Sequence, residues 1–228
     1  MNNNSRYVRI FEFSSIGLTV VLLIVNVTNP RMTFLFVTST AQGFILEYLF
    51  HKLGKYRYPM ERFTFKLPSE GYPPLSIVMG YFWFYSLPFY MSAKIIDLSG
   101  MVSPIWVILI MLFSSLAVEL LIDNLLTWIG LWRYDGRRRR IGLIPVGVAS
   151  TVPAFMTISL FLAYYSQSIL PWVGIIPGLS LAAVIAVLGG IAVCGLRMLR
   201  RLPEWVRLIL PGTITYLSLN LFYFALSI

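Results

Sequence analysis

Long apolar stretches alternate with short polar segments along the whole chain. A helix needs about 20 apolar residues to cross a bilayer core about 30 Å thick. Stretches of about this length cover residues 10–27, 32–50, 74–95, 102–129, 143–165, 170–194 and 206–227. The pattern predicts an all-α polytopic membrane protein with seven transmembrane helices, built as a single transmembrane domain over residues 1–228.

The composition agrees with this interpretation and leaves little room for a soluble domain. Hydrophobic residues make up 58% of the 228 residues and charged residues 12%, and the mean hydropathy is +0.79. These values lie well outside those of soluble globular domains. No small-x-small cleavage pattern follows the first apolar stretch, so we expect it to be a retained span and not a signal peptide.

The basic residues predict the orientation of the helices. If the N-terminus is cytoplasmic, Arg31 and Lys94 are the only ones of the 18 Lys and Arg residues on the outer side. This distribution follows the positive-inside rule. We therefore expect a multi-pass protein with a cytoplasmic N-terminus, in the plasma membrane of a prokaryote or in an internal membrane. The basic run 137–140 lies in a short loop between spans, so we expect no nucleic-acid partner.

An acidic signature occurs twice, 76 residues apart, each time near the end of an apolar stretch. The first copy comprises Glu47, Gly54, Tyr56, Arg57 and Tyr58, and the second comprises Asp123, Gly130, Trp132, Arg133 and Tyr134. A Gly-x-x-Pro segment follows each copy, at 71–74 and at 142–145. The register predicts a parallel internal repeat of helices 2–3 and 4–5, with repeat units at about 32–95 and 102–165.

Acidic side chains at this depth are functional candidates, because a carboxylate at the centre of a bilayer costs roughly 2.5–3.5 kcal/mol on insertion scales. Thr40, Gly43, Glu47 and His51 form one helical stripe, and Ser115, Glu119, Asp123 and Thr127 form another. We expect both stripes to face the bundle interior and to line one cavity. Glu119 and Asp123 are one turn apart, so we expect them to share a proton near neutral pH.

Aromatic side chains crowd the third apolar stretch. Tyr81, Trp83 and Tyr85 belong to this group, whose ring faces are suited to stabilising a carbocation. Packing and interface anchoring are the structural alternative. For Glu47 and Asp123 the alternative is a polar clamp to Arg57, Arg133 or the backbone. The candidate substrate-binding residues are Tyr81, Trp83, Tyr85, His51, Tyr58, Tyr134 and Asn124.

The sequence offers few metal ligands. Cys194 is the only cysteine and His51 the only histidine, and no Asp-Asp-x-x-Asp cluster occurs to hold magnesium and a diphosphate. We therefore predict no metal site and no cofactor.

The duplicated segment, over about residues 39–150, resembles the integral-membrane carotenoid biosynthesis proteins of the bisanhydrobacterioruberin hydratase type. The chain is also similar, more loosely, to heptahelical membrane terpene cyclases, which use membrane carboxylates to protonate an isoprenoid. Those cyclases usually carry an acid in the last helix, where this chain has only Thr213, Thr215 and Asn220 as polar candidates. The resemblance implies a membrane enzyme that acts on a hydrophobic isoprenoid, carotenoid or terpenoid lipid.

The expected chemistry is protonation of a C=C bond by acid–base catalysis. Asp123, with Glu119 sharing its proton, is the predicted acid. Glu47 is the predicted base, for either an attacking water or the cation itself. The first route gives an isoprenoid hydratase (a lyase) and the second a terpene or carotenoid cyclase (an isomerase). A non-catalytic small membrane transporter or lipid-binding subunit is the open alternative, as is association into a homo-oligomer or with a partner enzyme subunit.

Overall fold

The computed structural model describes residues 3–52, 58, 60–66, 72–101, 103–131, 134, 139–168, 174–197 and 203–226. Its elements are α1 (Asn3–Val25), α2 (Pro30–Lys52), the 3-10 turn η1 (Met60–Arg62), α3 (Leu75–Ser99), α4 (Pro104–Trp128), β1 (Arg140–Ile141), β2 (Ile144–Pro145), α5 (Val146–Tyr164), α7 (Ile175–Arg197) and α8 (Glu204–Leu226). The predicted all-α class is confirmed. Within the described residues, strand structure is limited to the antiparallel pair of β1 and β2.

Four helical segments are long and apolar enough to cross a membrane, and they indicate a membrane protein. They are Arg6–Val25, Pro104–Trp128, Val146–Tyr164 and Ile175–Gly195. The remaining predicted spans correspond to α2, α3 and α8, which contain 23, 25 and 23 residues. All three of these helices carry ionisable residues that lower their mean hydropathy, such as Glu47 in α2, Lys94 in α3 and Glu204 in α8. The count of seven spans therefore stays a prediction.

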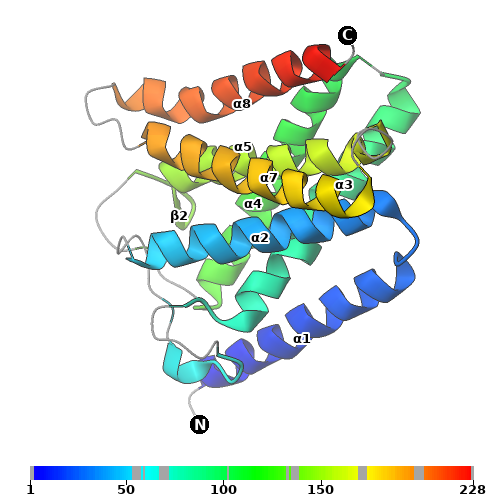
Figure 1. Cartoon of the computed structure of the whole chain (residues 1–228). Helices are drawn as coiled ribbons and strands as arrows, with labels where there is room; N and C mark the ends of the chain where they lie inside the picture. Colours follow the sequence, from blue (N-terminus) through cyan, green and yellow to red (C-terminus); the bar gives the residue numbers. More distant parts are fainter. Residues whose placement is uncertain are drawn as a thin grey trace.

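Helix α5 forms the centre of the molecule. It packs against α2, α3, α4, α7 and α8. Every residue from Pro153 to Ala163 is buried. A helix that is apolar on all sides is expected in such a central position. Figure 1 shows α5 behind α7 and enclosed by its neighbours.

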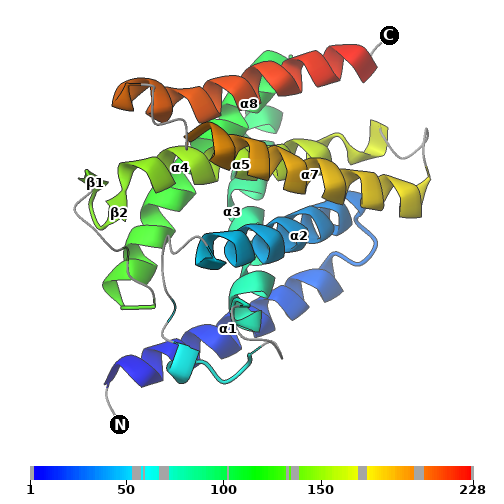
Figure 2. The same cartoon turned by 60° about the vertical axis from the view of Figure 1, so that its left-hand side comes forward.

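The other helices surround α5 in a regular succession. In Figures 1 and 2, α1, α2, α7 and α8 follow one another from one side of the molecule to the other, with α3 and α4 behind them. Helices α1 and α3 run in the same direction, because Ser15 bonds the carbonyl of Ser76 at 2.7 Å and Thr19, one turn later, bonds that of Met79 at 2.9 Å. This arrangement places the starts of α1 and α3 at one end.

A buried glutamine ties α2 to three other helices. The Nε2 of Gln42 donates to the carbonyl oxygens of Phe155 in α5 and Ala186 in α7, at 3.1 and 2.6 Å. Its Oε1 accepts hydrogen bonds from Tyr85 in α3 at 3.1 Å and from Ser159 in α5 at 2.9 Å. The amide therefore uses its two donors and both acceptor sites. The network fixes the relative heights of α2, α3, α5 and α7.

A second hydrophobic cluster closes the end at which α1 and α3 begin, which we call the inner end. It comprises Val8, Tyr58, Phe63, Ile77 and Leu131. These residues come from α1, the segment before α3, α3 itself and the residues after α4. The cluster therefore brings together segments that precede and follow α2 and α4, the helices that carry Glu47 and Asp123.

Glu12 of α1 anchors the segment that follows η1. Its carboxylate is fully buried and accepts hydrogen bonds from the backbone N–H of Thr64 at 2.9 Å and of Phe65 at 3.0 Å. Backbone donors compensate the cost of burying a charge. This contact fixes Thr64 and Phe65 against α1.

Candidate functional site

Glu47 lies near the inner end of α2 and is held by two phenols. It is 5% exposed. Tyr58 donates a hydrogen bond of 2.6 Å to its Oε2, and Tyr81 of α3 donates one to its Oε1. Both carboxylate oxygens thus accept an O–H donor. Donors on both oxygens favour the ionised form of a carboxylate.

Gly43 makes the contact between Tyr81 and Glu47 sterically feasible. It lies one turn before Glu47 on the same face of α2. A Cβ atom at this position would lie 2.6 Å from Cγ and 2.8 Å from Cδ2 of the Tyr81 ring. Real Cβ atoms do not approach that closely, so a side chain here would displace the ring. The glycine is therefore required for close packing of α3 on α2.

Asp123 repeats the carboxyl–phenol contact in α4. It is 4% exposed, and Tyr134 donates a hydrogen bond of 2.7 Å to its Oδ2. Burial raises the pKa of the Tyr134 phenol well above its usual value, and the neighbouring carboxyl groups of Asp123 and Glu119 raise it further. Tyr134 therefore stays protonated and acts as a donor.

The two contacts occur at matching positions of the duplicated signature. In each copy the tyrosine stands eleven residues after the acid to which it donates. The copies differ one turn before the acid, where the first has Gly43 and the second has Glu119. The first copy therefore admits a second phenol, whereas the second adds another carboxyl group.

Glu119 connects the two copies electrostatically. It is 2% exposed, and the charges of both Asp123 and Glu47 act on it. The Tyr85 ring lies in the field of Glu119 and Glu47, while its hydroxyl bonds Gln42. Tyr85 of α3 thus lies near carboxyl groups of both α2 and α4. Among the described side chains, no group of three acids, histidines or cysteines is arranged to hold a metal ion.

Two of the predicted substrate-binding residues make other contacts. The indole of Trp83 donates a 2.9 Å hydrogen bond to Ser15 and so faces α1. Asn124 supports the β1–β2 hairpin, because its Oδ1 accepts a 2.6 Å hydrogen bond from the backbone of Leu143. Its Nδ2 donates to the carbonyl of Leu120 at 2.7 Å. The side chain of His51 lies outside the described residues, as do Arg57 and Arg133.

The sequence interpretation overlooked Gln42 and gave no role to Gly43. Both lie in α2 close to Glu47. An amide within an apolar helix is costly unless it is paired, which is the same signal that singles out the acids. Gly43 was assigned to the stripe that includes Glu47. Its contact with Tyr81 could not be predicted, because that contact depends on how α3 packs against α2.

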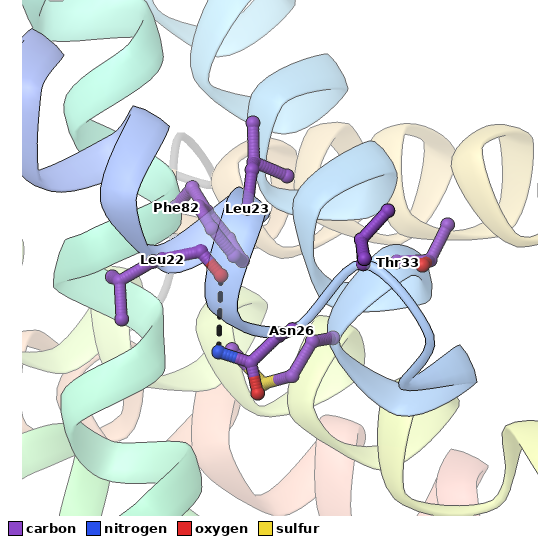
Figure 3. A pocket seen from close by; sticks show the side chains of 7 residues that line it. Leu22, Leu23, Asn26, Thr33 and Phe82 are labelled. Atoms are coloured by element: carbon purple, nitrogen blue, oxygen red, sulfur yellow. Dashed lines mark hydrogen bonds between the residues drawn. The ribbon is translucent and has the colours of Figure 1, made fainter.

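A cavity of about 250 Å³ lies away from the carboxyl groups, at the end where α1 joins α2. Figure 3 shows its wall, which is formed by Leu22, Leu23, Asn26, Val27, Met32, Thr33 and Phe82. Asn26 donates to the carbonyl of Leu22 at 3.0 Å and accepts from Tyr90 at 3.1 Å. The cavity predicted between the two acidic stripes stays a prediction.

Comparison of the chain with protein-family models, with curated proteins and with solved structures finds no match. The function is therefore argued from the carboxyl and phenol groups themselves.

Proposed function

We propose that the protein is a membrane enzyme that protonates a C=C bond of an isoprenoid lipid, with hydration or cyclisation as the outcome. One observation carries this proposal. The buried carboxyl groups of Glu47 and Glu119 interact electrostatically but differ in their neighbours. Both oxygens of Glu47 accept phenol donors, whereas the strongest charged neighbour of Glu119 is the carboxyl group of Asp123. Different environments are what separate a base from an acid in a carboxyl pair.

The acid in this proposal is the pair formed by Glu119 and Asp123. A buried carboxyl group beside a second carboxyl group favours its neutral form, because burial and like-charge repulsion both disfavour its ionisation. The O–H bond of this group breaks as the π electrons of the substrate form a new C–H bond. The adjacent carbon becomes a tertiary cation. Tyr134 stabilises the negative charge left on Asp123 through its hydrogen bond.

The base in this proposal is Glu47. In hydration, a water molecule forms a C–O bond with the cation and loses a proton to Glu47, so the net change is the addition of water. In cyclisation, an internal double bond attacks the cation, and Glu47 removes a proton from carbon, so the net change is an isomerisation. The rings of Tyr81 and Tyr85 have centroids 5.6 Å apart and lie beside Glu47, where they are suited to stabilising the cation. No metal or cofactor enters either route.

The substrate class rests on the setting of the site and on the motif resemblance. Helix α4 is long and apolar enough to span a membrane, which favours a lipid-soluble substrate at Asp123. The duplicated acidic signature resembles that of carotenoid hydratases. In the same proposal α2, α3 and α8 complete seven spans with a cytoplasmic N-terminus, and helices 2–3 and 4–5 are parallel repeats.

Expression in a carotenoid-producing bacterium tests the proposal. Pigments are separated by chromatography and identified by mass spectrometry. We expect a new product that is heavier by one water, or of equal mass but altered absorption. It should disappear in Glu47→Gln and in Asp123→Asn. The matched control is Glu61→Gln, because the Glu61 side chain is 73% exposed on η1.

An unchanged pigment profile with well-folded protein would contradict the proposal. A change in solute uptake under the same conditions would instead favour the transporter alternative. Persistence of the product in both acid variants would exclude Glu47 and Asp123 as the catalytic groups.

A further inference from the structure

Buried hydroxyl groups extend the acidic stripe of α4 in both directions. Ser115, Glu119, Asp123 and Thr127 follow one another at steps of four and share one face of the helix. Ser115 is fully buried, and its Oγ has no hydrogen-bond partner among the described residues. The buried Oγ1 of Thr127 has none either. Polar groups without a protein partner therefore lie on both sides of the acid pair.

These two hydroxyls differ from most of the buried hydroxyls in the other helices. A hydroxyl within a helix usually donates to the carbonyl one turn earlier. Thr38, Ser86, Ser92 and Thr157 do so, at 2.6–2.8 Å. Ser115 and Thr127 make no such hydrogen bond. Buried groups that do not bond protein are typically satisfied by ordered water.

We propose that water molecules bridge the polar groups of this stripe and relay protons between the inner end of α4 and Glu119. Successive members of the stripe are four residues apart, which is about 6 Å along the helix axis. That spacing is too long for a direct hydrogen bond and suits one bridging water. Thr127 lies at the inner end, Asp123 follows it, and Glu119 is the last acid. The relay thus connects the buried acid with the basic side of the molecule.

The relay rests on the proposed function, because it supplies the protons that the proposed reaction consumes. Each turnover transfers a proton from the acid pair to carbon, while another proton arrives at Glu47. The acid pair must therefore be reprotonated from outside the substrate. Proton exchange at Glu119 can be measured without any substrate, however, so the relay and the catalytic proposal can fail independently.

Infrared spectroscopy of the purified full chain in lipid nanodiscs tests the relay. A protonated carboxyl group gives a C=O stretching band that shifts when the proton is replaced by deuterium. Loss of a band in Glu119→Gln assigns it to Glu119. After transfer to D₂O, we expect this band to shift about tenfold more slowly in Thr127→Val than in the wild type, as for loss of one hydrogen bond on the path. Thr127→Ser, which keeps the hydroxyl, should restore the rate.

The matched control is Thr157→Val. It removes a buried hydroxyl of the same type, but one that already bonds the carbonyl of Pro153 at 2.7 Å. Equal exchange rates in Thr127→Val and Thr157→Val would overturn the relay and leave the catalytic proposal standing. A spectrum with no band that depends on Glu119 would also overturn it. A rate that depends on Thr127 in a protein without isoprenoid product would support the relay and contradict only the proposed reaction.

Discussion

Tyr58 stands eleven residues after Glu47 and donates a hydrogen bond of 2.6 Å to its carboxylate. Tyr134 makes the equivalent contact with Asp123, at the same sequence separation and at 2.7 Å. In each copy the α-helix that carries the acid ends between the two partners, and the phenol donates to the buried carboxyl group. The duplicated signature therefore specifies a local structure, namely a buried acid with its own phenol donor.

Removing either phenol should impair the site without unfolding the protein. We expect Tyr58→Phe and Tyr134→Phe each to lower product formation by about 10- to 100-fold, because a hydrogen bond to a charged group contributes about 1.5–3 kcal/mol. Tyr7→Phe is the control, since Tyr7 is 49% exposed. Product is quantified from membranes that contain equal amounts of each variant. Wild-type activity in both Tyr58→Phe and Tyr134→Phe would show that the phenols only pack.

Because Gly43 and Tyr81 are in close contact, adding a methyl group at position 43 should be unusually destabilising. Gly43→Ala should lower the free energy of unfolding by about 1–3 kcal/mol, the usual cost of overpacking, and should also reduce product formation. Gly17→Ala is the matched control, because a Cβ at Gly17 meets nothing within 4 Å. Thermal denaturation of the detergent-solubilised variants measures the difference. If Gly43→Ala proves as stable as Gly17→Ala, helix α3 does not pack on α2 as described.

Gln42 should be the most sensitive polar residue for stability. Gln42→Leu removes the hydrogen bonds to α3, α5 and α7 and leaves the hydroxyls of Tyr85 and Ser159 without this acceptor. We expect a loss of about 2–4 kcal/mol, since each buried group left unpaired costs about 1–3 kcal/mol. Gln167→Leu, at an exposed position, is the control. Thermal denaturation of both variants measures the difference in stability. Equal melting temperatures would rule out a structural role for the network.

Two exposed lysines test the orientation and the span count together. Lys66 and Lys94 lie at opposite ends of the predicted third span. In a chain with Cys194→Ser, we expect Lys94→Cys to react with a membrane-impermeant maleimide in intact cells. Lys66→Cys should react only after permeabilisation. Labelling of both from the same side would mean that α3 does not cross the membrane.

The helical architecture could be predicted because long apolar stretches leave few alternatives in a bilayer. The repeat places Tyr58 and Tyr134 at equivalent positions after Glu47 and Asp123, and both were predicted to bind substrate. Their hydrogen bonds to the two acids could not be predicted, because the sequence register does not show which side chains touch.

The sequence could not predict contacts between helices that are far apart along the chain. Tyr81, Trp83 and Tyr85 were interpreted as one aromatic wall, but residues two apart on a helix point to different sides. Trp83 therefore faces Ser15 of α1, whereas Tyr81 and Tyr85 face α2. Asn124 was among the predicted substrate-binding residues. Its partner is instead the backbone of Leu143 in the β1–β2 hairpin, a contact that the sequence does not indicate.

Deuterium incorporation tests the central claim most directly. Membranes that contain the protein are incubated with the isoprenoid substrate in D₂O, and the product is extracted, washed with ordinary water and analysed by mass spectrometry. Protonation of a C=C bond by a solvent-exchanged carboxyl group predicts one deuterium bound to carbon in each product molecule, with no such product in Glu47→Gln or Asp123→Asn. Full conversion without deuterium on carbon would contradict the mechanism.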